Sequence, residues 1–375
     1  MNIFNKYKDL IIDLIEKNKK ELNLDDDLNR HQITFELPPD QIDSDFSSNI
    51  CLILSKKNNL NPNELAIKIK NLIEKNLSNT FSVEIAKPCF LNFKLNSSSI
   101  QKSIIEIFND RKIYGSKKEQ KKYNIEFVSA NPTGPMHIGH CRGAVFGDVL
   151  ANLLEFHGNK VTREYYVNDY GNQIKNFTRS VYMRIREIKY KEKFIIDPDL
   201  YPGEYIKDIA KKIIDEDKNK DFKDFENDFD FLSQKSLNLS MEYIKSDLNK
   251  LGIKHDKFFY ESKIINDNLV QKTIKILQEE DYVINDFLPK PKGEENKNWK
   301  KIKRLIFKSS KFGDDNDRAL QKNDGTWTYF ANDIAYHHDK ILRKYDNLIN
   351  ILGADHTGYI KRISAAVKAL SKNQI

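Results

Sequence analysis

Two histidines three residues apart, His137 and His140, are the side chains of this chain whose spacing most clearly suggests chemistry. They stand in the segment 129–140, which reads Ser-Ala-Asn-Pro-Thr-Gly-Pro-Met-His-Ile-Gly-His. Imidazoles can donate hydrogen bonds to phosphate oxygens, and Gly139 between them lets a ligand approach the backbone closely. Two histidines at a helix start can also be partly buried polar residues without a ligand. With 8 histidines and 14 glycines in 375 residues, however, this string is rare by chance.

The elements expected around the pair favour a ligand site. An apolar run at 123–128 predicts a buried strand, and the apolar spacing at 142–157 predicts a helix. The histidines therefore fall on a strand-to-helix turn, which is where open α/β sheets bind nucleotides. The start of the helix offers free N–H groups to a phosphate. A covalent histidine intermediate is the less favoured interpretation, because no acidic residue at close spacing would orient either ring.

From residue 123 onward the pattern predicts an α/β domain built on a parallel sheet. Strand, helix, strand and helix follow one another at 123–128, 142–157, 160–167 and 171–189, which is a parallel βαβ arrangement. Residues 190–300, rich in Lys, Asp, Phe and Asn, predict an insertion without a hydrolytic constellation. Regular segments resume as strands at 304–309 and 326–331, a helix at 332–344, a strand at 346–352 and a helix at 358–370.

Residues 1–115 predict a separate, small α+β domain. Helical and strand-like stretches alternate there, the helical ones at 1–21, 47–76 and 97–110 and the strand-like ones at 34–37, 81–85 and 90–95. The lysine-rich segment 111–122 predicts a solvated linker. A chain of this length exceeds the usual size of a single core, so we expect two domains, at 1–115 and 116–375.

Composition narrows the class of protein. The 62 basic and 55 acidic residues give a formal charge of +7, which suits a polyanionic partner but does not by itself imply RNA. The three cysteines, Cys51, Cys89 and Cys141, form no Cys-x-x-Cys pair, so neither a disulfide framework nor a zinc site is indicated. No run approaches the ~20 apolar residues that a membrane span needs. We expect a cytoplasmic monomer with no membrane partner and no protein-bound metal.

Several further blocks carry a resemblance to a known family. The string Gly-Pro-Met-His-Ile-Gly-His at 134–140 resembles the first signature of class I aminoacyl-tRNA synthetases, and its surroundings at 126–135 resemble the arginyl-tRNA synthetases in particular. Blocks at 163–173, 201–205, 312–318, 324–336 and 353–359 are similar to the same family and occur in its order. The resemblance implies a class I Rossmann-like parallel sheet with an insertion, preceded by an α+β domain that contacts tRNA.

The activity implied by the resemblance is ATP-dependent activation of L-arginine to arginyl-adenylate and its transfer to the 3′ end of tRNA(Arg). His137 and His140 would be catalytic, donating hydrogen bonds to phosphate oxygens as charge develops. The residues expected to bind ATP are Gly134, His137, Gly139, His140 and His356. Mg²⁺ would come with ATP, held largely by phosphates and water.

Recognition of arginine requires carboxylates aimed at a planar fork of five donors. Three acidic positions follow predicted strands or begin predicted helices, namely Glu126, Asp333 and Asp355. The full set of arginine-binding residues that the resemblance implies is Glu126, Ser129, Asn131, His140, Tyr329, Asp333 and Asp355. Each has an ordinary structural alternative: a helix N-terminal acid for Asp333, a core aromatic on a strand for Tyr329, and turn chemistry for Ser129 and Asn131.

Other functions remain open at this stage. They are a class I synthetase for another amino acid, a smaller nucleotidyltransferase of the His-x-Gly-His type, and a noncatalytic tRNA-binding module. The lysine-containing second signature of the class and a helical anticodon-binding domain do not occur in these 375 residues. We therefore expect the N-terminal portion of a longer synthetase, with little or no tRNA charging of its own.

Overall fold

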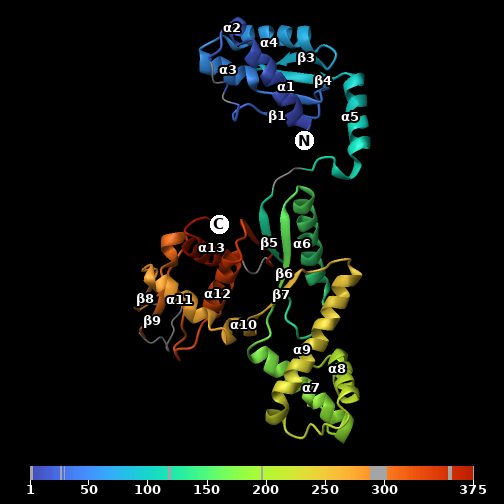
Figure 1. The fold of residues 1–375 in the computed structure, drawn as a ribbon, viewed down its shortest axis with the longest axis vertical. Helices are drawn as coiled ribbons and strands as arrows, with labels where there is room; N and C mark the ends of the chain where they lie inside the picture. The colour runs from blue at the N-terminus through green and yellow to red at the C-terminus, as the bar shows by residue number, and fades with distance from the viewer. Residues whose placement is uncertain are drawn as a thin grey trace. The chain divides into compact units, whose positions relative to one another are not determined.

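The computed structural model describes residues 3–25, 28, 30–116, 120–195, 197–287, 302–353 and 357–374. The chain divides into two compact units, Met1–Lys118 and Glu119–Ile375. The division falls inside the segment 111–122 that the sequence predicts as a linker. In Figure 1 the first unit runs from blue to cyan and the second from green to red.

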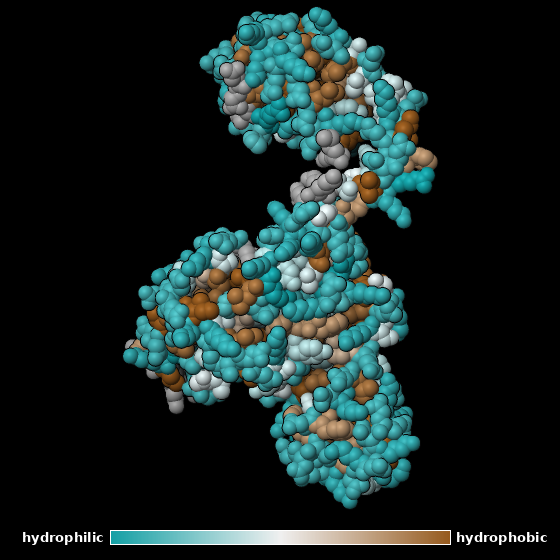
Figure 2. All heavy atoms as spheres, viewed as in Figure 1, coloured by the Kyte–Doolittle hydropathy of each residue, from teal (hydrophilic) through white to brown (hydrophobic). Residues whose placement is uncertain are grey.

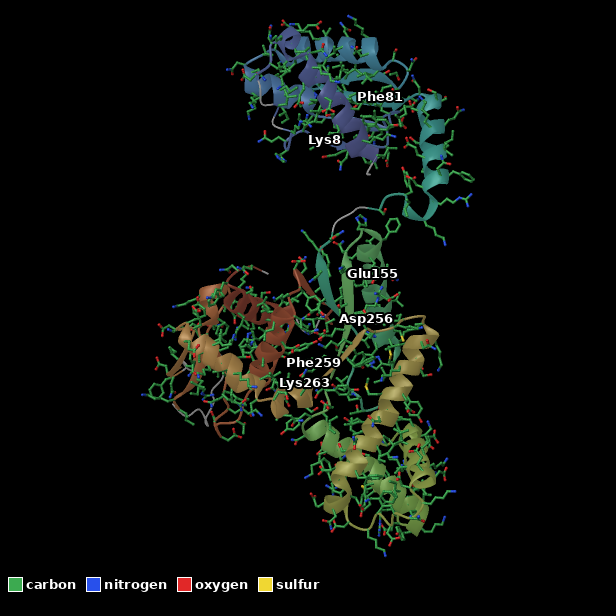
Figure 3. All side chains as sticks on the ribbon, viewed as in Figure 1. Lys8, Phe81, Glu155, Asp256, Phe259 and Lys263 are labelled. Carbon is green, nitrogen blue, oxygen red and sulfur yellow. The ribbon has the colours of Figure 1, made fainter. Side chains whose placement is uncertain are left out.

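The first unit is a four-stranded antiparallel sheet packed against helices. Its strands, in the order β1-β2-β4-β3, are β1 (Phe35–Glu36), β2 (Phe46–Ser48), β4 (Phe90–Leu95) and β3 (Phe81–Ala86). Its helices are α1 (Ile3–Lys17), α2 (Lys19–Leu22), α3 (Ile50–Asn58), α4 (Pro62–Leu77), α5 (Ser97–Asp110) and the 3₁₀ turn η1 (Arg111–Ile113). Aromatic rings fill the core: Phe46 stacks on Phe93 with ring centroids 4.8 Å apart, and Phe81 meets both rings edge-on. Figure 3 labels Phe81 in this unit.

The helical stretch expected at 47–76 is two helices, and asparagines separate them. Asn59 takes the left-handed conformation, with φ 53°, and ends α3. The side chain of Asn61 then accepts hydrogen bonds from the N–H groups of Asn63 and Glu64, and Pro62 is the first residue of α4. The first residues of the stretch also belong in part to β2.

The second unit is built on a four-stranded parallel sheet. Its strands, in the order β11-β5-β6-β7, are β11 (Asn347–Asn350), β5 (Lys122–Glu126), β6 (Lys160–Val167) and β7 (Lys257–Tyr260). Glu126 and Glu164 are register partners on β5 and β6. Because all four strands are parallel, their carboxyl ends meet at one edge of the sheet.

Helices cover both faces of this sheet, and Figure 1 shows α6 and α12 on opposite sides of β5 and β6. One core joins α6 (Ile138–Phe156) and α9 (Phe225–Lys250) to β5 and β6. Another joins β7 to α10 (Glu261–Asn266), α11 (Leu269–Glu279), α12 (Tyr329–Leu342) and α13 (Thr357–Ser371). A third core lies among α7 (Asn172–Tyr190), α8 (Glu204–Glu216) and α9.

A second, antiparallel sheet and a helix start differ from the sequence expectations. The strand expected at 304–309 is β9 (Arg304–Phe307), which pairs with β8 (Val283–Asp286) and β10 (Arg318–Ala319) in an antiparallel sheet. The 3₁₀ turn η2 (Ser309–Phe312) follows it. The strand predicted at 326–331 is wrong: Thr328 accepts a hydrogen bond from the N–H of Ala331 and caps α12, which begins at Tyr329.

The range 190–300, expected to be an insertion, contains part of the parallel sheet. β7 pairs with β6 along Glu164–Val167, so the nucleotide-binding fold resumes at Lys257. Between β6 and β7 the chain forms α7, α8 and α9, with their own core. Figure 3 labels Phe259 on β7 and Lys263 on α10, which follow this helical segment.

The described surface is mainly polar. Figure 2 shows hydrophilic side chains over most of the visible face of each unit, with smaller hydrophobic areas between them. Within the described ranges, every helix is too short or too polar to span a lipid bilayer.

Candidate active site

The turn after β5 is strained, and it sets the position of the first site residues. Val128 and Ser129 both have positive φ, 70° and 42°, a region that side chains other than glycine rarely adopt. The Ser129 hydroxyl accepts a hydrogen bond from the N–H of Tyr166 (3.0 Å) and donates one to Glu126 Oε1 (3.2 Å). Strain of this kind is characteristic of functional sites, where surrounding contacts hold the backbone in place.

The two histidines lie together at the start of α6. His137 is the N-cap residue, and its ring stacks on that of His140 with centroids 3.6 Å apart. The N–H of His137 donates to His140 Nδ1 (3.4 Å), so the neutral His140 ring carries its proton on Nε2. Burial, with a smaller effect of His137, lowers the pKa of His140. His140 is therefore a neutral ring with one N–H to donate.

A cavity of about 820 Å³ opens beside these rings. It lies at the carboxyl ends of β5 and β11. The strands that follow β5 in sequence, β6 and β7, lie on one side of β5, and β11 lies on its other side, so the strand order reverses at this point. Such a switch point is the usual nucleotide site of an open parallel sheet. The lining residues are Val128, Ser129, Ala130, Asn131, His137, Gly139, His140, Arg142, Gly143, Phe146, Ile351, Leu352 and Gly353.

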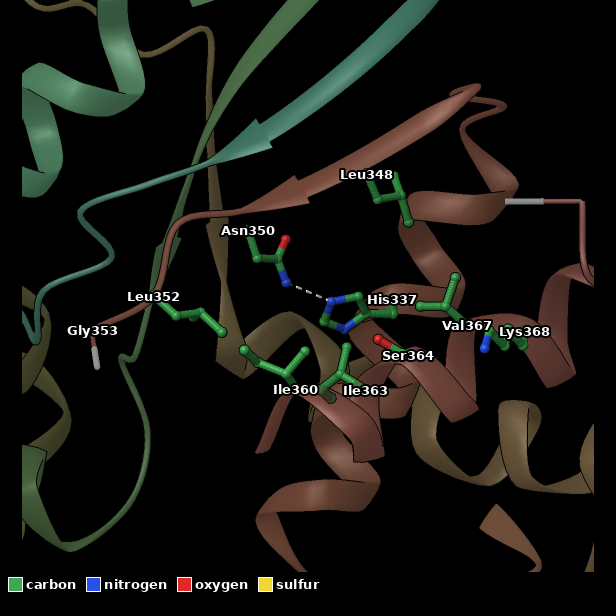
Figure 4. Close-up of a pocket in the computed structure, with 10 residues that line it drawn as sticks. All are labelled: His337, Leu348, Asn350, Leu352, Gly353, Ile360, Ile363, Ser364, Val367 and Lys368. Carbon is green, nitrogen blue, oxygen red and sulfur yellow. Dashed lines mark hydrogen bonds between the residues drawn. The ribbon is translucent and has the colours of Figure 1, made fainter. Parts of the chain in front are cut away.

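A second cavity, of about 540 Å³, lies between β11 and α13 (Figure 4). Most of its lining is apolar, from Leu348, Leu352, Ile360, Ile363 and Val367. His337 and Asn350 are hydrogen bonded to each other at one side of it. Because the first cavity contains the histidine pair and the helix N-terminus, it is the better candidate for a phosphate-bearing ligand.

The expected glycines have different surroundings. A Cβ on Gly139 would come within 3.0 Å of the His137 ring, so a side chain here would displace that ring. Gly134 does not line the 820 Å³ cavity. A Cβ on Gly134 would lie 2.9 Å from the ring of Tyr205, whose hydroxyl donates to the carbonyl of Thr133. Gly134 thus has a packing role in the turn, apart from any contact with a ligand.

Three carboxylates from three different elements form an acidic group on the other side of the turn. Glu126 ends β5, Glu261 begins α10 and Asp333 lies in the first turns of α12. Burial raises the pKa of Asp333 to about 7, and the nearby Glu126 and Glu261 add to the increase. Burial also raises the pKa of Glu261, whose Oε1 accepts from Asn332 at 3.1 Å. Of the three acidic positions expected to converge, Glu126 and Asp333 are thus close enough to interact electrostatically.

Glu261 and Tyr166 are candidate site residues that sequence reasoning missed. Burial and the charges of Glu261, Asp333, Glu126 and Asp169 raise the pKa of Tyr166, which places this phenol among four carboxylates. The missing signal was β7: once a strand is recognised at Lys257–Tyr260, Glu261 stands at its carboxyl end, as Glu126 does on β5.

For the remaining expected site residues, the structure shows no hydrogen bond to the acidic group among those that it describes. Asn131 is exposed, and its amide donates to Gln173 Oε1 at 2.8 Å. Tyr329 is 75% exposed, with the Lys322 ammonium 5.6 Å from its ring centroid. Asp355 and His356 lie outside the described residues. In the described part of the chain, no group of three or more His, Cys, Asp or Glu side chains has the arrangement of a metal site.

Comparisons with known proteins identify the family of the chain. A family model described as tRNA synthetases class I (R), catalytic domain, matches residues 103–373. A second, described as arginyl tRNA synthetase N terminal domain, matches residues 5–95. An arginyl-tRNA synthetase structure from Thermus thermophilus covers 98% of this chain with a TM-score of 0.61 at 17% identity, which supports the fold alone.

Curated relatives are similar over the whole chain. A protein of Pelagibacter ubique named Arginine--tRNA ligase is 49% identical over 374 residues, which are 99% of this chain and 65% of the relative. One of Rickettsia bellii with the same name is 44% identical over 385 residues, 100% of this chain and 64% of the relative. The chain thus spans slightly less than two thirds of the relatives' length. The fold class expected from the sequence is confirmed, and the chain belongs to the class I tRNA synthetases of the arginyl (R) family.

Proposed function

We propose that this chain carries the ATP-binding and arginine-binding parts of an arginine–tRNA ligase. Such an enzyme activates L-arginine as arginyl-adenylate and transfers it to the 3′ end of tRNA(Arg). The observation that carries the proposal is the position of three carboxylates, Glu126, Glu261 and Asp333, beside a turn whose other side presents His137 and His140 to a cavity.

ATP would occupy the 820 Å³ cavity, with its phosphates at the start of α6. The Nε2–H of His140 and the ring of His137 would donate to phosphate oxygens, and they stabilise the charge that develops as pyrophosphate leaves. The partial positive charge of the helix N-terminus adds to this effect. Gly139 and Gly143 leave room on the helix surface for the adenosine portion. Mg²⁺ would arrive with the phosphates.

Arginine would lie across the turn, with its carboxylate toward the α-phosphate. Ser129 and Glu126 are on the turn itself, so they suit the α-amino end of the substrate. Glu261 and Asp333 lie on α10 and α12, and two carboxylates from different helices can accept from both arms of a guanidinium. Asn131 and Tyr329 are exposed and would close over the substrate. In the same arrangement, Asp355 and His356 would contribute to the arginine and ATP sites, respectively.

Charge balance favours a dicationic amino acid. The ammonium of Lys340 already contacts Glu126. Above about pH 7, where Asp333 is ionised, the three carboxylates and this internal cation leave two negative charges. Arginine supplies two positive charges, on its α-ammonium and its guanidinium. Lysine has the same charges, but its ammonium is a point charge that cannot engage two carboxylates as a planar fork. A class I synthetase for lysine is therefore the closest alternative.

The Met1–Lys118 unit would contact tRNA, as expected for a region that matches an arginyl tRNA synthetase N terminal domain. We also propose that the protein works in the cytoplasm as a monomer. The rival interpretation, a noncatalytic tRNA-binding module, requires tRNA binding without specific binding of an amino acid.

Calorimetric titration of the chain with four ligands tests the proposal. We expect saturable binding of L-arginine and of ATP, much weaker binding of L-lysine, and no measurable binding of L-citrulline, whose urea group has the shape of the guanidinium without its charge. Equal affinity for arginine and citrulline, or tighter binding of lysine, would overturn the arginine assignment. Binding of tRNA with no response to any amino acid would favour the noncatalytic alternative.

A further inference from the structure

Lys340, on α12, is a fully buried cation in contact with the proposed amino-acid site. Its Nζ lies 2.6 Å from Glu126 Oε2, with 0% of the lysine side chain exposed and 12% of the glutamate. The ammonium also donates to Asn350 Oδ1 at 3.0 Å and stands 4.5 Å from the ring centroid of Tyr336. A buried ammonium is tolerated only when charged and polar partners surround it, so this position is defined by several contacts at once.

The contacts of Lys340 continue into a directed chain of hydrogen bonds. The carbonyl of Asp333 can only accept, so His337 Nδ1 must donate to it (2.8 Å) and His337 Nε2 must accept from Asn350 Nδ2 (2.8 Å; Figure 4). Asn350 then accepts from Lys340 through Oδ1, and Lys340 donates to Glu126. The chain therefore links the backbone of Asp333 to the carboxylate of Glu126 with every donor matched to an acceptor.

A second ion pair from the same helix shows what Lys340 adds. Glu126 and Glu164 are register partners, so a half-buried and a fully buried glutamate stand side by side on adjacent strands. Arg343 donates to both carboxylate oxygens of Glu164, and the Tyr336 hydroxyl donates to Glu164 Oε1 at 2.9 Å. Cations on the segment of α12 thus neutralise one glutamate on each of the two strands. Of these two glutamates, only Glu126, the partner of Lys340, belongs to the acidic group.

We propose that Lys340 is a positioning residue for the amino-acid site: it fixes the orientation of Glu126 toward the α-ammonium of the substrate and reduces the charge of the acidic group to match a dication. The inference rests on the proposed function. Without Lys340, the three carboxylates, once Asp333 is ionised, would face two substrate cations. Glu126 Oε2 would also lose its only cationic contact among the described residues. Lys340 does not itself touch the reacting atoms.

The test uses Lys340→Met, which keeps an unbranched side chain of nearly the same length and removes its charge. L-arginine and 5-guanidinopentanoate, which is arginine without the α-amino group, are titrated into wild type and variant. We expect the variant to lose at least about tenfold in affinity for L-arginine and only about twofold for 5-guanidinopentanoate. A purely structural role would weaken both ligands to the same extent, and that result would overturn the proposal.

Arg343→Met is the matched control, because it breaks the neighbouring ion pair on the same helix. It should reduce thermal stability without changing the ratio of the two affinities. If Lys340→Met does not fold, the double variant Glu126→Gln/Lys340→Met removes both charges of the pair. It should bind 5-guanidinopentanoate like wild type and L-arginine weakly, and full affinity for L-arginine would overturn the inference. Failure of the wild-type chain to bind L-arginine would instead reject the proposed function, and this inference with it.

Discussion

The hydroxyl of Tyr359, on α13, donates a hydrogen bond to Asp333 Oδ2, on α12. This contact gives Asp333 a neutral donor and no cation, in a position where burial and the charges of Glu126 and Glu261 raise its pKa to about 7. The carboxyl group that we propose to bind the guanidinium therefore changes its charge near neutral pH, and this has two measurable effects.

Binding of L-arginine should depend on pH through Asp333. Above about pH 7 the carboxylate is ionised and can accept from the guanidinium, whereas below it the protonated group cannot balance the substrate charge. Affinity should fall by up to about tenfold for each unit of pH below 7. Calorimetric titrations between about pH 5.5 and about pH 8.5 measure this dependence, because they span the pKa of Asp333. An affinity that stays constant across the range would contradict the role of Asp333.

The variant Asp333→Asn should lose arginine binding but gain stability above neutral pH. The folded-state pKa lies above the unfolded value, so the stability gained from protonation is complete below the ordinary aspartate pKa of 3.8 and is lost as the pH rises through about 7. Above pH 7 the buried carboxylate costs stability, and the amide removes that cost. We expect the variant to gain on the order of 1–2 kcal/mol in free energy of unfolding above neutral pH, while it loses arginine binding. Urea unfolding at alkaline and acidic pH measures the difference, which should vanish in acid.

Glu261→Gln should weaken the binding of L-arginine more than that of L-lysine. The glutamate accepts from Asn332 and would supply the second carboxylate for the guanidinium fork, which the lysine ammonium does not need. A loss of about tenfold or more for L-arginine is expected. Glu280→Gln, which removes one partner of an exposed pair with Lys372, is the control and should leave both affinities unchanged. Equal losses for the two amino acids would place Glu261 outside the guanidinium contact.

Gly134→Ala should destabilise the turn before α6. Its Cβ would lie 2.9 Å from the Tyr205 ring, which must move or force the backbone aside. A cost of about 1–3 kcal/mol in free energy of unfolding is expected. Gly143→Ala is the comparison, because a Cβ there meets nothing within 4 Å and should stabilise the helix by about 0.5–1 kcal/mol. Chemical denaturation measures the stability of both variants. If both stabilities changed in the same direction, the packing role of Gly134 would be refuted.

The sequence predicted the elements whose patterns are strong and local. The strand at 160–167 and the helix at 97–110 have the bounds of β6 and α5. The strand-to-helix turn was recognisable because Asn-Pro-Thr-Gly-Pro breaks both neighbouring patterns. The resemblance to the family also predicted that acidic residues about 200 positions apart, such as Glu126 and Asp333, belong to one site, which local periodicity could not have shown.

What the sequence could not give depends on distant contacts. Trp327, Tyr329 and Phe330 look like a strand, and only the cap at Thr328 shows that a helix begins there. β7 has only four residues and lies in a charged region, so its own sequence does not predict a strand. It is recognised as a strand only through its pairing with β6, and for this reason Glu261 at its end was missed. A lysine on a helix normally predicts a solvated side chain. Lys340 is buried because two strands bring Glu126 and Glu164 beneath α12, which is a property of the assembled fold.

Among the described strands, β11 pairs with β5 along one side and leaves its other side unpaired. Unpaired strand edges recruit further strands. A polypeptide that paired there would lie beside the 540 Å³ cavity, which Asn350 and the buried ring of His337 help to line. Asn350 accepts a hydrogen bond from Lys340, which in turn contacts Glu126. Binding of a polypeptide at the edge of β11 would therefore alter the surroundings of Glu126 without any contact with the substrate. Hydrogen bonds through Asn350 and Lys340 thus link the outer border of this sheet to the proposed amino-acid site.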